Sequence, residues 1–445
     1  MNRLATMLPL LLASVALAQS EMPAAAPQST PIAIVNARVE TVVPGAAPIE
    51  RGHVVFDRGR IVAVGAGDPA ALPAGCQTID ASGLTVLPGY MNAGSQLGLV
   101  ETLQVPATDD RVEFGAYHPE IRSCVAVNPD SNLLPVARTG GVLNTCLFPQ
   151  GGVVGGHASV MRLDGWTSED QTVIPRAGLV VNWPVTQPIV APWMDKSVED
   201  QKKDAEKQLK EIDRFFDQAK AWVDAFEADP KGTPGDLRFQ NMIEAVRGRE
   251  PVIFRANSPG AIEGCVLWAT RRGLKPVIFG GLGAEQCVPL LQKHRVPVIV
   301  AGLHRLPRRS GGAIDEVYRL PAQLQAAGIP FCIATDSDPS NERHLPDHAA
   351  TAVAYGLPRD AALAAITRQP AVICGAGDTL GTLEPGKSAT LQVISGTPME
   401  MTAEPLVAFI DGRRVDLGNH QTRLDAKYRE KYARMGKLPA TTKKP

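Results

Sequence analysis

The sequence predicts an α/β fold in which parallel strands alternate with helices around a barrel. Short apolar runs rich in β-branched residues recur through the middle of the chain, and segments with helical spacing follow several of them. A repeat of roughly twenty to thirty residues per strand and helix is typical of βα units. In such a barrel the functional site lies at the carboxyl ends of the strands.

The predicted elements of the barrel follow one another in the central part of the chain. Strands are predicted over residues 140–148, 251–256, 275–280, 297–301 and 331–335. Helices are predicted over residues 259–272 and 284–293. A longer charged segment, 195–229, carries apolar residues at helical spacing. This stripe favours a helix packed on the surface over a coiled coil that binds a partner, because an apolar stripe mainly reports packing.

Both ends of the chain are rich in short β runs. The first group covers residues 32–35, 39–43, 53–56 and 60–64, and Pro44-Gly45 and Arg58-Gly59 separate its members. The second group covers residues 381–394 and 406–415, where Asp411-Gly412 is typical of a hairpin turn. Each end therefore predicts a small β-sheet module.

Length and charge limit the classes of protein that the chain can be. It has 445 residues, which suits one large domain with an accessory one. Lys and Arg total 45 and Asp and Glu total 46, so the net charge of −1 gives no reason to expect nucleic acid as a partner. We expect a small-molecule ligand or substrate. The sequence does not decide whether the protein forms a homo-oligomer.

The first residues are typical of a secretory signal peptide, predicted over 1–18. Arg3 supplies the positive end, residues 7–12 are apolar, and Ala16-Leu17-Ala18 is a small-residue cleavage site. A buried first helix is the alternative. Residues 19–30 are rich in Ala, Pro, Gln and Ser and predict a flexible linker. No later apolar run reaches the ~20 residues that span a bilayer, so we expect an exported periplasmic or extracellular protein.

The seven cysteines predict buried free thiols. Their number is odd, they form no Cys-x-x-Cys pair, and most have apolar neighbours, as in Ile329-Pro-Phe-Cys332-Ile. A disulfide framework or a cysteine zinc site is therefore poorly supported. An oxidising compartment would still allow one disulfide, and the sequence does not show which two cysteines would form it.

Three motifs carry a resemblance to a known family. They are Pro88-Gly-Tyr-Met-Asn-Ala-Gly-Ser-Gln96, Ala334-Thr-Asp336, and Asn341-Glu-Arg-His-Leu-Pro-Asp-His348 with the segment that follows it. In type and order they resemble the amidohydrolase superfamily, and most closely its imidazolonepropionase-related branch. The resemblance implies a (β/α)8 TIM-like barrel over residues 88–380. It also implies a discontinuous β-sandwich built from both chain ends, 31–87 and 381–417, followed by a C-terminal tail over 418–445.

The resemblance also implies a metal centre, and here the chain departs from the family. The two histidines of the first strand fall on Gly94 and Gln96, the next falls on Arg255, and another falls near Gly280. Only Asp336 keeps the expected residue type. Gly offers no ligand, Gln is a weak neutral donor, and a protonated guanidinium repels a cation. We therefore expect no cofactor, and a divalent metal such as zinc is disfavoured.

The hypothesis that follows is a substitution of charge. Arg255 takes the place and positive charge of the metal and pairs with Asp336. Asp336 and Arg255 are thus the predicted catalytic residues.

Further polar residues are candidates for binding a substrate at the barrel mouth. They are Gln96, Glu101, His118, His157, Asn257 and His344. His157 stands in a glycine-rich segment that predicts either a ligand cradle or a tight turn. His344 and His348 have a spacing that can chelate a metal on a helix, but Pro346 between them is expected to begin that helix. A structural role is the competing interpretation for each.

Two functions follow from these observations. The first is a hydrolase of non-peptide C–N bonds in cyclic amide-type substrates, working without the usual metal ligands. The second is an exported pseudoenzyme, an amidohydrolase-like barrel kept as a ligand-binding or scaffold protein.

Overall fold

The computed structural model describes residues 23–185, 188, 190, 194–307, 311–336 and 338–437. The signal peptide predicted over 1–18 and the first part of the predicted linker lie outside the described residues. Residues 23–30 are not a free linker, because hydrogen bonds tie them to the body. The Ala25 amide donates to the Asp164 carboxylate, and the Gln28 side chain donates to the Phe56 carbonyl.

The central sheet nearly closes into a barrel. In space the strands run β13-β12-β11-β10-β9-β8-β7-β6, and β13 lies back against β6. Their bounds are β6 (Tyr90–Ser95), β7 (Val142–Leu147), β8 (Val154–Arg162), β9 (Thr172–Asn182), β10 (Pro251–Ala256), β11 (Lys275–Gly280), β12 (Val298–Ala301) and β13 (Phe331–Ala334). The strands predicted for β7 and β10–β13 are confirmed within a residue or two at each end.

One strand departs from the expected (β/α)8 pattern. β8 runs antiparallel to both β7 and β9, whereas the other neighbouring strands in this sheet are parallel. The connection from β7 to β8 covers only residues 148–153. It is too short for a helical crossover, so the chain must return as a hairpin. The observed architecture is therefore an α/β barrel-like fold.

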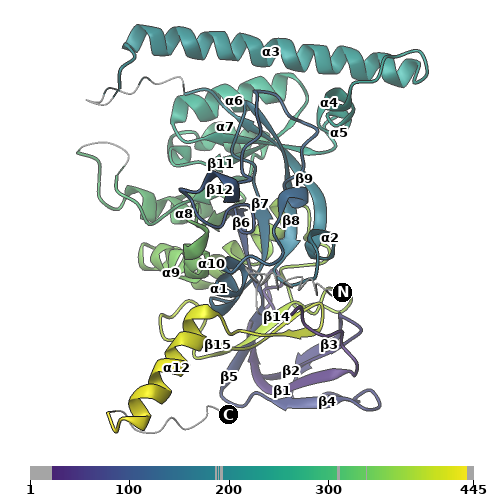
Figure 1. The fold of residues 1–445 in the computed structure, drawn as a ribbon, viewed down its shortest axis with the longest axis vertical. Helices are drawn as coiled ribbons and strands as arrows, with labels where there is room; N and C mark the ends of the chain where they lie inside the picture. The colour runs from purple at the N-terminus through teal and green to yellow at the C-terminus, as the bar shows by residue number, and fades with distance from the viewer. Residues whose placement is uncertain are drawn as a thin grey trace, which may run out of the picture.

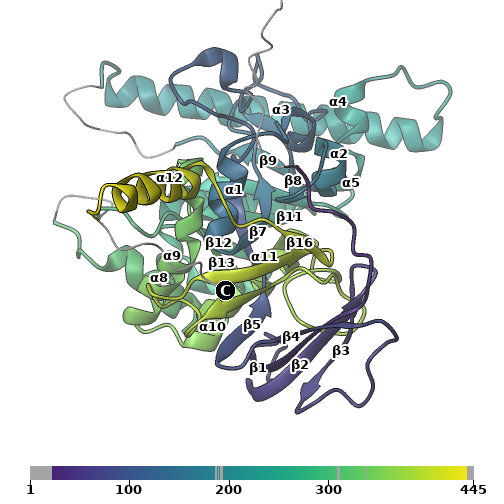
Figure 2. The same ribbon diagram turned by 60° about the horizontal axis from the view of Figure 1, so that its bottom comes forward.

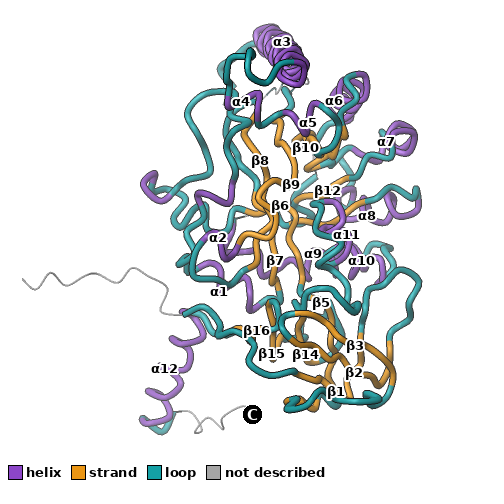
Figure 3. The backbone as a smooth tube through the Cα atoms, turned by 90° about the vertical axis from the view of Figure 1, so that its right-hand side faces the viewer, coloured by secondary structure: helices purple, strands orange, loops and turns teal. Residues whose placement is uncertain are grey.

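Apolar side chains fill the inside of this sheet. Alternate strand positions, among them Met91, Ile253, Val277, Phe279 and Ile299, form one buried cluster. Because side chains alternate between the faces of a strand, the residues between them point outward to the helices. The helices close the outer layer of the core, as the orange strands and purple helices of Figure 3 show.

Helices stack down one side of the strands (Figure 1). Their bounds are α1 (Leu133–Thr139), α2 (Ser168–Gln171), α3 (Val198–Ala228), α4 (Leu237–Gln240), α5 (Ile243–Val246), α6 (Pro259–Arg271), α7 (Val288–His294), α8 (Glu316–Ala326), α9 (Leu345–Ala354), α10 (Arg359–Ala365), α11 (Arg368–Ile373) and α12 (His420–Arg434). Short 3-10 helices cover η1 (Pro106–Thr108), η2 (Ser123–Ala126), η3 (Ala284–Gln286) and η4 (Pro339–His344).

The long helix α3 is packed on the body, as its apolar stripe predicts. It lies along the top of the molecule in Figure 1. Ile212, Phe216 and Val223 are buried, and the Phe216 ring meets the Trp268 ring of α6 edge-on. No helix in the described ranges is both long enough and apolar enough to cross a membrane.

The second sheet joins the two ends of the chain. Its strands run β16-β15-β14-β5-β1-β2-β3, with β4 beside β1. Their bounds are β1 (Ile32–Val39), β2 (Ile49–Asp57), β3 (Arg60–Ala66), β4 (Gln77–Asp80), β5 (Leu84–Pro88), β14 (Leu391–Ser395), β15 (Pro405–Ile410) and β16 (Arg413–Val415). β14 pairs antiparallel with β5, and Figure 2 shows the late strands beside the early ones. The β module expected from both ends is present, as one continuous hydrogen-bonded sheet with its own core.

The structure also bears on the expectations for the C-terminal tail and for the cysteines. The C-terminal tail carries α12, which begins with a capping box between Asn419 and Thr422 and buries none of its residues. All seven cysteines are free, and each except Cys76 is buried, so the prediction of buried thiols is confirmed for the others.

Candidate functional site

Arg255 and Asp336 stand at the carboxyl ends of two barrel strands. Arg255 is the fifth residue of β10, opposite Phe279 of β11 in the parallel register. Asp336 follows β13 and has a φ of +43°, a left-handed conformation that is uncommon for a residue other than Gly. Backbone strain of this kind is concentrated at functional sites.

The two side chains influence each other electrostatically. Loss of hydration raises the pKa of Asp336 above its ordinary value, and the positive charges of Arg255 and Arg305 oppose that rise. Loss of hydration lowers the pKa of Arg255, and the charge of Asp336 opposes that fall. The structure gives no ion pair within 4.0 Å between these two described residues. The predicted ion pair between Arg255 and Asp336 is therefore not formed, and only a longer-range electrostatic influence remains.

The Arg255 guanidinium is held by the barrel wall. Its Nη2 atom donates a hydrogen bond to the Pro149 carbonyl at 3.3 Å. Its Cζ atom lies 4.9 Å from the centre of the Phe279 ring, a cation–π contact. Its Nε atom is buried and has no hydrogen-bond partner among the described residues. The guanidinium therefore keeps unused hydrogen-bonding capacity.

A buried carboxyl group, which the sequence analysis did not single out, links the first and last strands. Glu342 of η4 is 1% exposed, and it accepts a hydrogen bond of 2.6 Å from the Ser95 hydroxyl at the end of β6. Asn92 of β6 donates to the Thr335 hydroxyl and accepts from the Thr335 amide. Loss of hydration raises the pKa of Glu342 to about 7. The hydrogen bonds that this carboxyl group accepts oppose the rise, because they lower its pKa.

This network fixes the backbone on both sides of the candidate site. Ser95 adjoins Gln96, and Thr335 adjoins Asp336. Glu342 belongs to the motif that begins at Asn341, so the sequence could have indicated it. The motif does not show that the Glu342 side chain is buried.

Gln96 and Asn257 lie near the strand ends with partners of their own. The Gln96 Oε1 atom accepts a hydrogen bond of 3.0 Å from Arg111, whose guanidinium is also bound to Asp109. Asn257 follows β10 and is exposed, with its side chain close over Gly280. Both residues follow the carboxyl end of a barrel strand, Gln96 after β6 and Asn257 after β10.

The contacts given for three of the other four candidates are with residues other than Arg255 and Asp336. Glu101 accepts from the Asn128 side chain, His118 lies 3.5 Å from Glu120, and His344 lies 2.7 Å from Asp347. These contacts place them in three separate surface segments. His344 is the residue before α9, as the position of Pro346 predicts.

His157 lies in a strand, not in a loop. The glycine-rich segment forms the start of β8, and His157 is fully buried. Its Nε2 atom lies 3.3 Å from Glu250 and 3.1 Å from Arg176, and these two residues form an ion pair of 2.8 Å. Glu250 immediately precedes β10, so this cluster lies at the opposite end of that strand from the end near Arg255.

Comparisons with known proteins agree on one family. Residues 277–418 match the model of the amidohydrolase family. Amidohydrolase tasK of Hapsidospora irregularis is 24% identical over 81% of this chain, and an imidazolonepropionase of Caulobacter sp. is 24% identical over 79%. A crystal structure of an amidohydrolase from Thermotoga maritima covers 86% of this chain and 99% of its own, with a TM-score of 0.75 and 24% identity.

Residues 277–418 thus match the amidohydrolase family, and the likeness to imidazolonepropionases over most of the chain supports the amidohydrolase superfamily. The alignments cover 39% of the length of the tasK relative and 89% of the imidazolonepropionase. The structural match shows the shared fold.

The position of the first family histidine is too crowded for a side chain in this amidohydrolase. A Cβ atom on Gly94 would stand 2.6 Å from Cε2 of Phe279 and 3.2 Å from Cβ of Ala334. Real Cβ atoms do not approach other atoms so closely, so Phe279 has to move before any side chain fits there. The Phe279 ring therefore occupies the space beside Gly94 on the first strand.

The donor set at the remaining positions does not suit a divalent cation. Arg255 brings a positive charge, and the Gln96 oxygen is already bound to a second guanidinium. Among the residues that the structure describes, no three His, Cys, Asp or Glu side chains form a group that can hold a metal ion. The family's metal thus does not fit these residues.

Proposed function

We propose that this amidohydrolase cleaves C–N bonds of cyclic amide-type, non-peptide substrates with Asp336 as general base and Arg255 as the cation that stabilises the oxyanion. The observation that carries the proposal is that these two groups stand at the carboxyl ends of β10 and β13 and each shifts the pKa of the other, without a direct ion pair. A substrate carbonyl with its attacking water needs a base on one side and a donor on the other.

Asp336 has the properties of a general base. A carboxylate whose pKa is raised by loss of hydration accepts a proton more readily than an ordinary surface carboxylate. In the proposed reaction it takes a proton from water, and the water oxygen forms a bond to the carbonyl carbon. The same proton then passes to the leaving nitrogen as the C–N bond breaks.

Arg255 supports the other half of the reaction. The carbonyl oxygen gains negative charge as water adds, and preorganised donors stabilise that charge. The guanidinium charge is available for this role, because the hydrogen bond to Pro149 uses only Nη2. The contact with Phe279 fixes the guanidinium plane in advance.

The names of the relatives and the polar side chains at the barrel mouth support the proposed substrate class. The matched relatives carry the names amidohydrolase and imidazolonepropionase. Around the mouth, Gln96 and Asn257 offer amide groups that suit a polar ring. We further propose that the protein acts after export, as its first residues predict, and that no metal ion takes part.

Comparing Asp336→Asn with the wild type on a panel of cyclic imides, lactams and dipeptides tests the proposal. We expect turnover of a cyclic amide to fall by about 10²- to 10⁴-fold, as when a general base is removed. Asp360→Asn is the matched control, because Asp360 is an exposed carboxylate on α10. Equal turnover by Asp336→Asn and wild type would contradict the role of Asp336, and stoichiometric zinc in the purified protein would contradict the metal-free mechanism.

A ligand-binding pseudoenzyme is the second candidate. The observation that favours it is the Phe279 ring, which fills the space beside Gly94 and narrows the centre of the barrel. On this account a cyclic amide binds to wild type and binds more weakly to Arg255→Met, while neither protein releases product. If the metal-free wild-type protein hydrolyses a cyclic amide at a detectable rate, the protein is a hydrolase and not a pseudoenzyme.

A further inference from the structure

Helix α12 carries an apolar stripe that the described part of the chain leaves exposed. The helix follows β16 and points away from the body (Figure 1 and Figure 3), and none of its residues is buried. Its large apolar side chains recur every three or four positions, so they lie along one side of the helix. These side chains, called the α12 stripe below, belong to Leu424, Tyr428, Tyr432 and Met435 and are between 37 and 54% exposed.

The long helix α3 shows how a covered stripe looks in this protein. Its apolar residues Ile212, Phe216 and Val223 are at most 2% exposed, because they pack against the body. The charges of the two helices also differ. α3 has nine acidic and six basic residues, whereas α12 has two acidic and five basic ones. α12 is therefore a basic helix with an uncovered stripe, on a chain whose net charge is −1.

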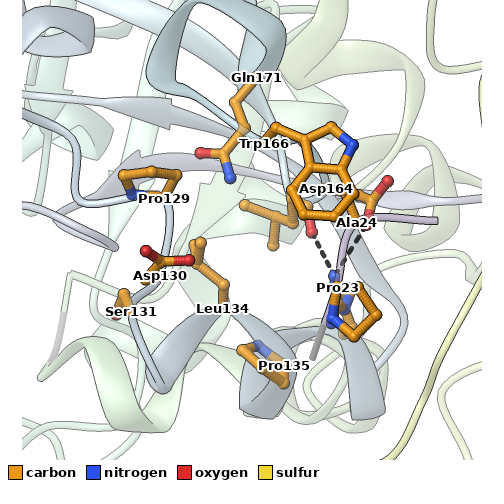
Figure 4. Close-up of a pocket in the computed structure, with 13 residues that line it drawn as sticks. Pro23, Ala24, Pro129, Asp130, Ser131, Leu134, Pro135, Asp164, Trp166 and Gln171 are labelled. Atoms are coloured by element: carbon orange, nitrogen blue, oxygen red, sulfur yellow. Dashed lines mark hydrogen bonds and ion pairs between the residues drawn. The ribbon is translucent and has the colours of Figure 1, made fainter. Parts of the chain in front are cut away.

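Buried charges in the body are compensated by neighbours, unlike some charges of α12. At the cavity shown in Figure 4, Asp164 forms ion pairs with Arg138 and Arg413 at 3.4 and 2.9 Å. These charges satisfy one another within the protein. On α12, by contrast, Lys427 and Lys431 form no ion pair with any described residue.

The two lysines lie along one edge of the α12 stripe. Each of them follows a residue of the stripe by three positions, which places it about 60° around the helix axis. The Lys431 Nζ atom lies 5.7 and 5.8 Å from the ring centres of Tyr428 and Tyr432. The aliphatic part of such a side chain covers apolar surface while its ammonium group stays in a polar layer.

The two carboxylates of α12 do not cancel these charges. Asp425 pairs with Arg429 at 2.7 Å, and Glu430 pairs with Arg434, so each carboxylate already has a partner on the same helix. No Asp or Glu follows Glu430 in the sequence, whereas three further lysines do. This end of the chain therefore attracts an anionic partner.

The type of apolar residue indicates what kind of partner this is. Tyr is enriched at the boundary between a bilayer and water, because its ring is apolar and its hydroxyl group stays hydrated. A helix with an apolar stripe, basic flanks and low overall hydrophobicity is typical of segments that lie in this boundary. A second copy of α12 suits the stripe less well, since two basic helices repel each other.

We propose that α12 binds the surface of an anionic lipid bilayer. The α12 stripe enters the headgroup region, and the ammonium groups of Lys427 and Lys431 bind the lipid phosphates. Attraction to anionic lipids and burial of the stripe then act together, as in other amphipathic helices at membrane surfaces. The helix lies along the surface and does not cross the bilayer.

Sedimentation of the full chain with lipid vesicles tests the proposal. One set of vesicles contains phosphatidylcholine alone, and the other contains about equal parts of phosphatidylcholine and phosphatidylglycerol. At about 0.1 M salt we expect binding to the anionic vesicles to be at least about tenfold stronger, and at about 1 M salt we expect most of this difference to be lost. Equal binding to both sets, or binding to neither, would overturn the proposal.

A charge variant locates the contact on α12. The double variant Lys427→Gln/Lys431→Gln is expected to bind anionic vesicles about tenfold more weakly or less, because each basic residue near the surface adds to the attraction. Lys207→Gln/Lys210→Gln is the matched control, since these two lysines are exposed on the acidic helix α3. The control should bind as the wild type does. Unchanged binding by Lys427→Gln/Lys431→Gln would overturn the proposal.

A second variant tests the α12 stripe. Tyr428→Ser/Tyr432→Ser is also expected to weaken binding by about tenfold, because it removes apolar area from the stripe. The residues of the predicted signal peptide are the same in every protein compared, so they do not explain a difference between them. Thermal unfolding shows whether each variant is folded, and the comparison of vesicles and salt on the wild type decides the matter if one is not.

Light scattering separates a lipid surface from a second copy of the chain. A wild-type dimer that Tyr428→Ser/Tyr432→Ser converts to a monomer, together with no vesicle binding, would show that the stripe meets a second copy. That result would contradict the proposal. An unchanged oligomeric state with weakened vesicle binding supports it.

Discussion

At the scale of single residues, the site is set by charges that have lost their hydration. Loss of hydration raises the pKa of Asp336, although this residue keeps an exposed surface, and that of the buried Glu342, and it lowers the pKa of Arg255. Burial disfavours the charged form of each group, and only a partner of opposite charge compensates. Arg255 and Asp336 provide that compensation for each other, whereas Glu342 has only neutral hydrogen-bond donors around it.

Replacing Glu342 by Gln tests the consequence for stability. The folded-state pKa of Glu342 is about 7 against an ordinary 4.5, so the folded protein holds a proton that the unfolded chain releases between these values. Wild-type stability should therefore decline as pH rises from about 4.5 to 7. Because Gln resembles the protonated acid, Glu342→Gln should be more stable than wild type at pH 8, by about 2–3 kcal/mol, and equal to it near pH 4.5. Urea unfolding at both pH values measures this, and a variant less stable than wild type at pH 8 would refute the assignment.

Replacing Arg255 by Met tests the coupling with Asp336. The positive charge of Arg255 lowers the pKa of Asp336, so its removal should raise that pKa further. Titration of the Asp336 carboxyl carbon by NMR measures the shift directly. Arg305→Met should act in the same direction, since Arg305 also lowers this pKa. An unchanged Asp336 pKa in Arg255→Met would show that the two groups do not interact.

At the scale of the elements, the interior of the barrel is packed to fit a glycine on its first strand. β6 passes so close to β11 and β13 that Gly94 leaves room only for the Phe279 ring and the Ala334 methyl group. The spacing of apolar residues predicted the strands, and it predicted α3 to within three residues at its start and one at its end. It did not predict β8 and β9, because the glycine-rich start of β8 has the composition of a loop.

Gly94→Ala is expected to destabilise the fold. The added methyl group would meet Phe279, and overpacking of this kind costs about 1–3 kcal/mol. Phe279→Leu in the same chain should recover much of that loss, because the smaller side chain vacates the space. Denaturant unfolding of the two single variants and the double variant gives the interaction energy. Additive effects of the two changes would mean that the residues do not compete for space.

At the scale of the whole molecule, the two chain ends and the barrel are joined by a buried cluster of charges. Asp164 follows β8, is 4% exposed, and accepts from Arg138 of the barrel layer, Arg413 of the second sheet and the Ala25 amide. These contacts connect three parts of the chain that are remote in sequence.

Asp164→Asn should therefore weaken the connection between barrel and second sheet. Two buried or half-buried guanidinium groups lose their counter-charge, and breaking a buried ion pair costs about 3–5 kcal/mol. Asp68→Asn removes an exposed ion pair with Arg51 and should cost less than about 1 kcal/mol. Thermal unfolding compares the two variants. A loss for Asp164→Asn no larger than that for Asp68→Asn would show that the cluster contributes little.

The sequence by itself determined the fold family, the run of strands and helices, and the unusual residues at the metal-ligand positions, because these depend on the order and spacing of residue types. Only the tertiary structure decided which polar groups meet. It brought Glu342 to Ser95 across 247 positions and buried His157 beside Glu250, away from the mouth. It also set the Phe279 ring against Gly94. Spacing along a chain fixes which face a side chain occupies, whereas burial and the pKa of a charge depend on neighbours that only folding supplies.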